Sequence, residues 1–287
     1  MKIFSLRFVL LASLLAAISV ISFAQGSYKK PPKEIMDVLD APAIPGTSIS
    51  PTRDKIAMLE PLRYPPIADL AQPMLRLAGT RVNPATNGPH LQGYSVSLTL
   101  KSVSDGKESK VSLPAGAKVA GVQWSPDGKH IAMSNITASG IELWFVDTAT
   151  ARARKVNNVL INGAFGGFGW EGSTHVSAFI IPAGRGTAPA YTNIVPSEPN
   201  IQETSGRRGA IATVQDLLKT PNDEKLYEYY ATSQLAMIAT DGKVRNIGSP
   251  AIFDNAVVSP DGKYIYASRI VRPFRSEERR VGKECCR

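Results

Sequence analysis

The chain has 287 residues, with 33 Lys or Arg against 24 Asp or Glu and a formal net charge of +9. No basic cluster is interleaved with aromatic residues, which argues against a nucleic-acid-binding surface. The two cysteines, Cys285 and Cys286, stand together near the C-terminal end, so the preceding chain has no disulfide framework, thiolate metal site or cysteine nucleophile.

Residues 1–24 have the features of a secretory signal peptide. Lys2 and Arg7 form a short positive region, residues 8–23 are apolar apart from a few serines, and a small-x-small cleavage site precedes Gln25. The apolar stretch is short for a stable membrane span. We therefore expect a periplasmic or secreted bacterial protein that has no membrane attachment once the signal peptide is removed.

A hairpin motif recurs after a lead-in segment at 25–48. Its clearest form is Ser-Pro-Asp-Gly-Lys between alternating apolar residues, with two good and two degenerate copies, at 124–133, 258–267, 49–58 and 170–176. Proline presets the first turn position, and Asp-Gly tolerates positive φ. Each copy therefore predicts two antiparallel strands joined by a tight turn.

A second type of hairpin lies between these copies, at 96–111, 141–156 and 235–247. Two hairpins for every roughly 40–50 residues match one four-stranded blade of a β-propeller. Residues 49–274 are therefore predicted to be all-β and to form a partial β-propeller of about four blades. An open ring leaves strand edges exposed, so we do not expect this stretch to be a complete folding unit.

Two segments interrupt the repeat, at 64–91 and 182–230. The second has helical character at 211–218 and again at 224–230, with a helix stop and a new N-cap at 220–223 between them. We interpret both segments as insertions, partly helical, that project from the blades. Long ordered insertions are usually functional or packed on a partner domain.

Residues 275–287 differ in kind from the rest. From Arg275 onward they match, codon by codon, the translation of a common sequencing adapter, although a charged disordered tail would have a similar composition. We expect a library artefact here and exclude the segment from the predicted fold. The genuine reading frame would then be interrupted after Phe274.

Four stretches of the chain carry a family resemblance. They are PPKEIMDVLDAP at 31–42, IADLAQPMLRLAG at 67–79 with the Asn83-Pro84 turn after it, residues 191–235 with QDLL at 215–218 and YYATSQL at 229–235, and Arg272-Pro273-Phe274. They resemble the propeller of prolyl oligopeptidase-family serine peptidases, and within that family the glutamyl endopeptidase branch. The resemblance covers nearly the whole chain up to Phe274. The Ser-Pro-Asp-Gly-Lys repeats are less specific, because many periplasmic propellers contain them.

The resemblance implies a two-domain enzyme that cleaves peptides after glutamate. A seven-bladed propeller would restrict access, and an α/β-hydrolase domain would supply a serine nucleophile, a histidine base, an aspartate and an oxyanion hole. That domain would follow Phe274, and the chain contains no G-x-S-x-G nucleophile elbow. We therefore assign no catalytic, cofactor or metal residue within this chain. The expected partners are a peptide substrate and the hydrolase domain.

Two other functions stay open from the residues alone. The first is a non-catalytic periplasmic propeller that binds a protein or a glycan, and the second is a scaffold without a ligand. The stretches at 31–42 and 191–235 favour the peptidase.

The histidines and tryptophans are the residues that could suggest a site elsewhere. The histidines are His90, His130 and His175, and the tryptophans are Trp124, Trp144 and Trp170. Without a nucleophile elbow, and with spacings that do not suggest a metal site, the histidines are expected to be structural. The tryptophans lie on predicted strands and are expected to fill space between blades rather than form a ligand cage.

Two short patterns are given no functional role. Residues 163–172 are rich in glycine but lack the Lys-Ser/Thr ending of a phosphate loop, so closely packed inner strands are expected. Asn135-Ile136-Thr137 matches a glycosylation sequon.

Overall fold

The computed structural model describes residues 29–191, 216–274 and 283–285. The chain divides into two units, residues 1–42 and residues 43–287, which are described separately. The signal peptide predicted at 1–24 lies outside the described residues. Within the described ranges, no helix is long and apolar enough to cross a membrane.

The first unit contains the helix α2 (Lys33–Leu39). Pro32 precedes it, and proline readily stands at the entrance to a helix because its missing N–H needs no partner there. Glu34 lies in the first turn, where a negative charge is favourable, and Lys33 pairs with Asp37 one turn later at 2.6 Å. None of its described residues is buried.

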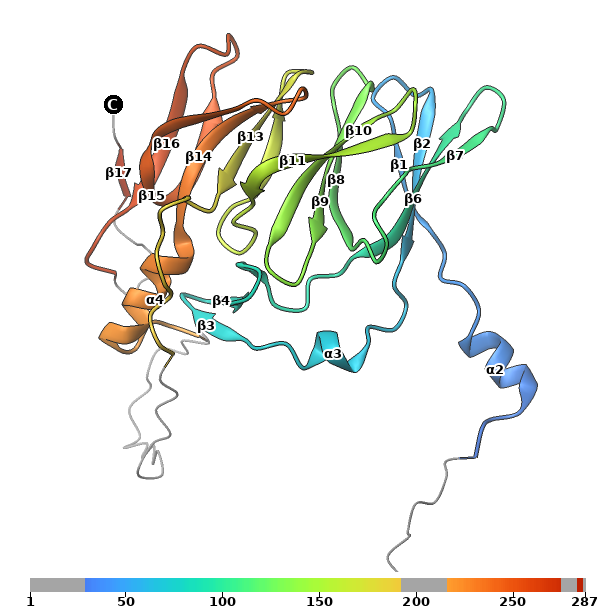
Figure 1. The fold of residues 1–287 in the computed structure, drawn as a ribbon, viewed down its shortest axis with the longest axis horizontal. Helices are drawn as coiled ribbons and strands as arrows, with labels where there is room; N and C mark the ends of the chain where they lie inside the picture. The colour runs from blue at the N-terminus through green and yellow to red at the C-terminus, as the bar shows by residue number, and fades with distance from the viewer. Residues whose placement is uncertain (1–28, 192–215, 275–282, 286–287) are drawn as a thin grey trace, which may run out of the picture. The chain divides into compact units, whose positions relative to one another are not determined.

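The second unit consists mainly of antiparallel strands that follow one another along the chain (Figure 1). The first two groups of four strands are β1 (Gly46–Ile49), β2 (Lys55–Pro61), β6 (Ser95–Ser102) and β7 (Glu108–Lys110), and then β8 (Val119–Trp124), β9 (His130–Ile136), β10 (Ile141–Asp147) and β11 (Arg152–Leu160). These groups meet where Ser95 of β6 pairs with Val119 of β8.

The third group is continued directly into the next one. Its strands are β12 (Phe168–Glu171), β13 (His175–Ile180), β14 (Thr232–Ala239) and the first part of β15 (Val244–Val258). The second part of β15 pairs instead with β16 (Ile265–Ile270). The described chain thus has three four-stranded meanders and the opening hairpin of a fourth, which confirms the predicted partial propeller.

The edge of β16 is occupied by a strand from the segment that was excluded from the predicted fold. β17 (Lys283–Cys285) pairs antiparallel with β16, with Ser268 opposite Cys285. An unpaired strand edge accepts an extended segment of any origin. The adapter origin of residues 275–287 therefore stays a prediction.

The predicted Ser-Pro-Asp-Gly turns share one hydrogen-bond pattern. In the copy between β8 and β9, Ser125 donates from Oγ to Asp127 at 2.7 Å and accepts from the backbone N–H of His130 at 2.9 Å. Ser259 makes the same two bonds between β15 and β16. Gly128 and Gly262 both have φ near 70°, where glycine is favoured. Local chemistry therefore determines these turns.

The turns and the insertions lie at opposite ends of the strands. In an antiparallel meander of four strands, the loops after the first and third strands lie at one end, and the loop after the second strand lies at the other end. We call the end with turns 50–54, 125–129, 172–174 and 259–264 the turn face. The insertion face carries the connections β2–β6 and β13–β14, with residues 64–91 in the first and the described residues 182–191 and 216–230 in the second. The elements α3, β3, β4 and α4 lie along this face (Figure 1).

The insertions have secondary structure of their own. The first contains α3 (Ile67–Leu70) and a three-stranded sheet of β3 (Leu75–Leu77), β4 (Thr80–Asn83) and β5 (Gly88–Pro89). The second contains α4 (Pro221–Ala231), which begins at the expected N-cap. Thr220 accepts from the backbone N–H of Asp223, whose side chain accepts from the N–H of Thr220.

The prediction of a helix at 211–218 is wrong for residues 216–218, the part of this segment that the structure describes. Asp216–Leu218 are not helical, and Asp216 has a φ of 60°. Its carbonyl accepts from Gly79 N–H at 2.9 Å, and its carboxylate pairs with Arg76 and Arg81. Contact with the first insertion therefore replaces the local helical preference. Residues 211–215 lie outside the described residues.

Three apolar clusters organise this unit. The first lies between the second and third meanders, the second lies between the first and second, and the third joins both insertions to the end of the blades. The members of the third cluster are Leu75, Leu77, Val82, Leu218, Leu226, Tyr227, Tyr230, Ala231 and Ile252. The two insertions are therefore packed on each other.

Candidate functional site

The three histidines are not brought together. His130 begins β9 and His175 begins β13, both at the turn face, whereas His90 follows β5 in the first insertion. His175 Nδ1 lies 2.9 Å from Thr174 Oγ1, and His90 Nδ1 is buried without a hydrogen-bond partner among the described residues. The three residues do not form a common site.

The tryptophans pack against the apolar clusters and use their ring N–H groups within the fold. Trp124 donates to Ser48 at 3.1 Å, and Trp170 donates to the Gln123 carbonyl at 3.0 Å. Trp144 donates to Glu142 at 2.8 Å and also lines a cavity. Trp124 and Trp170 do not line that cavity.

The close packing expected for the glycine-rich segment is found at its start, at Gly163 and Gly166. A Cβ at Gly163 would lie 2.6 Å from Cδ1 of Ile141, and one at Gly166 would lie 2.5 Å from Cβ of Phe179. At Gly166 the neighbouring atom is the Cβ of Phe179, which cannot move aside easily, so glycine is needed there. An added Cβ at Gly167, Gly169 or Gly172 would meet no atom within 4 Å.

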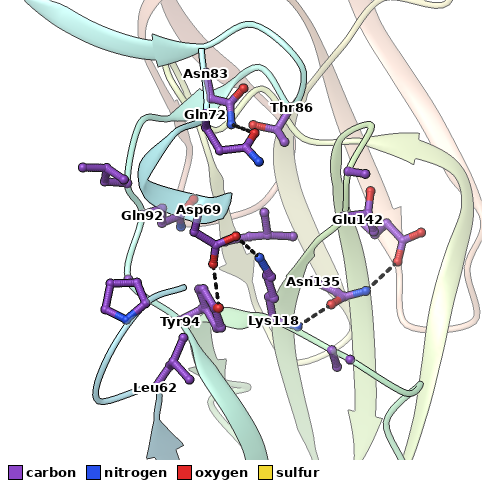
Figure 2. Close-up of a pocket in the computed structure, with 18 of the residues that line it drawn as sticks. Leu62, Asp69, Gln72, Asn83, Thr86, Gln92, Tyr94, Lys118, Asn135 and Glu142 are labelled. Carbon is purple, nitrogen blue, oxygen red and sulfur yellow. Dashed lines mark hydrogen bonds and ion pairs between the residues drawn. The ribbon is translucent and has the colours of Figure 1, made fainter. Parts of the chain in front are cut away.

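A cavity of about 940 Å³ opens on the insertion face, between the first insertion and the first two meanders (Figure 2). Its volume lies within the range of about 300–1,000 Å³ that is usual for ligand sites. One wall comes from residues 62–94, another from 114–118, and a third from 135–155. None of the described residues that line it is Ser, Cys or His, so it lacks the usual nucleophile and base of a hydrolytic site.

A cluster of three polar residues occupies one end of the cavity (Figure 2). Asp69 of α3 accepts from Lys118 Nζ at 2.6 Å and from the Tyr94 hydroxyl at 2.8 Å. Lys118 also lies over the Tyr94 ring, 4.8 Å from its centroid. The cluster thus joins the first insertion to the residues just before β6 and β8.

The three groups change one another's protonation. The Lys118 ammonium, with the Tyr94 hydroxyl, holds the pKa of Asp69 below its usual range. Burial opposes the charge on Lys118, but the hydrogen bond to Asp69 helps to outweigh it and the pKa of Lys118 is raised. Burial and the bond to Asp69 raise the pKa of Tyr94. At neutral pH the cluster is an ion pair with a neutral phenol.

A second polar cluster lies on the blade wall. Glu142 of β10 accepts from Asn135 at 3.0 Å, from Trp144 at 2.8 Å and from Lys155 at 2.5 Å. Burial opposes the charge of Glu142, yet the bonds from Lys155, Asn135 and Trp144 outweigh it and hold its pKa below the usual range. Asn135, the residue of the sequon, is 6% exposed and committed to this cluster.

The two clusters are connected through the backbone. The N–H of Lys118 donates to Oδ1 of Asn135 at 2.9 Å, and Asn135 in turn donates to Glu142 (Figure 2). Two sets of hydrogen bonds, joined through the side chain of Lys118, therefore link Tyr94 to Glu142 along the cavity. This arrangement can hold and orient a ligand.

Sequence reasoning singled out none of the charged residues of this cavity. Asp69 lies in the stretch 67–79 that carries the family resemblance, and this resemblance was the feature of the sequence that could have pointed to it. Lys118 precedes β8 and Glu142 lies within β10, and only the folded chain places them on one cavity. In the described part of the chain no group of three or more His, Cys, Asp or Glu residues could hold a metal ion.

Comparison with known proteins gives two relatives with the same description. The chain is 37% identical over 269 residues to "Probable glutamyl endopeptidase, chloroplastic" of Oryza sativa subsp. japonica, and the match covers 88% of this chain and 29% of the relative. It is 36% identical over 261 residues to the protein of that description from Arabidopsis thaliana, covering 86% and 27%. The chain thus spans less than a third of the length of these relatives.

No protein-family model matches the chain. Among solved structures, the acylaminoacyl peptidase of Pyrococcus horikoshii aligns with a TM-score of 0.39 and 14% identity, over 76% of this chain and 27% of that one.

Proposed function

Because the chain is homologous to the glutamyl endopeptidases over most of its length, we propose that it is the propeller part of a serine peptidase that cleaves peptides after glutamate. The observation that carries this is 37% identity over 88% of the chain. The serine, histidine and aspartate of the reaction would lie in an α/β-hydrolase domain that follows Phe274.

The role proposed for this part is to bind and admit peptides rather than to cleave them. The cavity on the insertion face has side chains for binding, but its lining lacks a nucleophile paired with a base. Packing of the two insertions on each other would restrict which chains reach the catalytic groups.

Recovery of the intact locus tests this proposal. Long-read sequencing across the codon for Phe274 is expected to show a frame that continues into G-x-S-x-G, followed by aspartate and then histidine. A frame that stops after a few more blades would overturn the peptidase assignment.

The 287-residue chain itself is expected to hydrolyse no peptide. Its incubation with glutamyl peptide substrates should give no turnover above a heat-killed control. Turnover that survives purification would mean that this part contains catalytic groups of its own.

The cavity also favours a second candidate, a non-catalytic periplasmic propeller that binds a protein or a glycan. Its hydrogen-bonding side chains without a reactive group would suit such a binder equally well. The same sequencing experiment separates the candidates, because only the peptidase requires the hydrolase domain.

Export to the periplasm or the medium is part of the proposal, and the positive, apolar and small-residue pattern of residues 1–24 supports it. N-terminal sequencing of the protein recovered from the producing cells is expected to begin at Gln25. A product that retains Met1 and stays in the cytosol would contradict export.

A further inference from the structure

The charged residues that line the cavity form two ion pairs, so their positive and negative charges balance. Asp69 is joined to Lys118 at 2.6 Å and Glu142 to Lys155 at 2.5 Å. An acidic ligand would meet both carboxylates, and a basic ligand would meet both ammonium groups. The cavity is therefore electrically balanced, which favours an uncharged ligand.

The polar groups offer donors and acceptors in alternation. A lysine ammonium has three N–H groups, and in the described structure Lys155 uses a hydrogen bond to Glu142 and Lys118 a hydrogen bond to Asp69. Carboxylate oxygens likewise accept more than one bond. Spare donors and spare acceptors thus follow one another along the chain that runs from Asp69 to Glu142.

Apolar side chains make up the rest of the lining. The larger ones are Leu62, Leu70, Leu91, Ile136 and Trp144, together with Pro65, Pro89 and Pro114. Leu70 and Leu91 are 51% and 55% exposed, although burial would be favourable for such side chains. A ligand with apolar groups beside its hydrogen-bonding groups would cover them.

The two ion pairs are only partly buried, with the Lys118 side chain 33% exposed and the Lys155 side chain 42% exposed. Exposed ion pairs contribute little to stability. The hydrogen-bonding groups of these pairs, which Asn135 links, are therefore open to a ligand that enters the cavity.

We propose that this cavity binds an uncharged, apolar stretch of extended polypeptide. An extended chain presents one N–H and one C=O per residue, which matches the alternating donors and acceptors between Asp69 and Glu142, while its side chains cover Leu70 and Leu91. The site would select a part of the polypeptide other than the bond that is cut. Only the identification of that polypeptide as a substrate rests on the proposed function.

Binding is tested by calorimetry on the 287-residue chain with a capped Ala-Leu hexapeptide. Versions with glutamate or lysine at the centre, and an N-acetylglucosamine tetramer, serve as comparisons. The neutral peptide is expected to bind at least about tenfold more tightly than either charged peptide, a difference of about 1.4 kcal/mol. Equal or tighter binding of the acidic peptide, or binding of the sugar alone, would overturn the proposal.

Variants that obstruct the cavity test whether the peptide binds there. Ala115 and Ala138 line it from two walls and are exposed, so Ala115→Trp and Ala138→Trp fill it without entering the core. Ala149→Trp is the matched control, because Ala149 is exposed in a turn on the opposite face. Both cavity variants should raise Kd at least about tenfold and the control should not. Unchanged binding in both cavity variants would exclude this site.

The two proposals fail separately. A locus without a hydrolase domain would end the peptidase assignment. The proposed peptide site would still be supported if Ala138→Trp abolished peptide binding. If the locus contains a hydrolase domain but the peptide binds equally well to both obstructed variants, the peptidase assignment stands and the cavity is not the binding site.

Discussion

The blades and the insertions are held together over different distances along the chain. In a blade turn, Ser125 bonds to Asp127, two positions away. In the insertions, Arg81 bonds to Asp216, 135 positions away, and Asn87 bonds to the carbonyl of Tyr230, 143 positions away. The blades thus repeat a local rule, whereas the insertions depend on the blades to bring them together.

This difference separates the two kinds of stability. The inner blade strand β9 is buried along most of its length and is paired with β8 on one side and β10 on the other, so its loss should unfold the whole unit. The insertions share one apolar cluster and one buried polar network on the insertion face, and they can open while the strands stay paired.

The largest effect is expected in the blades. Leu143, in the middle of β10, is 0% exposed. Leu143→Ala should lower the free energy of unfolding by about 2–5 kcal/mol, because it leaves a cavity in the core. Chemical denaturation measures this, with the exposed Leu91→Ala as control. Equal effects of the two variants would contradict the described core.

The next largest effect should be confined to the insertions. Asn162 is 0% exposed and donates to the Tyr230 carbonyl at 2.8 Å and to Ser233 at 2.9 Å, while it accepts from Asn87 at 2.7 Å. Asn162→Ala should cost about 1–3 kcal/mol, because buried polar groups lose their partners.

Hydrogen exchange shows where that loss falls. Amides of β4 and α4 should exchange faster in Asn162→Ala, whereas those of β9 and β10 should keep their protection. The exposed Asn157 provides the matched control, Asn157→Ala. Uniformly faster exchange across the blades would mean that the insertions and the blades form one cooperative unit.

A smaller effect is expected at the start of α4. Thr220→Ala removes the side-chain acceptor of the capping box and should cost about 0.5–2 kcal/mol. Thr220→Ser keeps the hydroxyl and should restore most of the loss. If both variants behave alike, the cap contributes nothing measurable to the stability of α4.

A blade turn offers a stabilising change. Arg53 has a φ of 60° at the turn position that Gly128 and Gly262 occupy in the other copies. Arg53→Gly should remove backbone strain and raise the free energy of unfolding by up to about 1 kcal/mol, less the added freedom of the unfolded chain. Gly128→Ala should do the opposite, because its Cβ would lie 2.5 Å from Thr52 Oγ1. A destabilised Arg53→Gly would show that this turn uses its arginine side chain.

The smallest effect concerns pH and the cavity. The pKa of Asp69 in the folded chain lies below its ordinary value of 3.8, with the bond from Lys118 as the largest cause. The stability that this bond contributes is complete above pH 3.8 and is lost as the pH falls through the lower folded value. Asp69→Asn should therefore lie closer to the unmodified chain at low pH than at pH 7. A constant gap over that range would mean that Asp69 titrates normally.

Much of the fold follows from local patterns. The Ser-Pro-Asp-Gly turns, the strands around them and the N-cap at Thr220 were predictable, because each depends on residues within a few positions. The predicted resemblance to glutamyl endopeptidases is confirmed by 37% identity over most of the chain. The helix expected at 211–218 is not found at Asp216–Leu218, since contact with Gly79 and two arginines overrides local propensity there.

The sequence by itself determined the repeating hairpins and their order along the chain. Only the tertiary structure decided that the insertions pack on each other and that Asp69 and Glu142 share one cavity. The physical reason is distance along the chain: a turn needs only its neighbours, whereas Asp69 bonds to Lys118, which lies 49 positions later in the sequence.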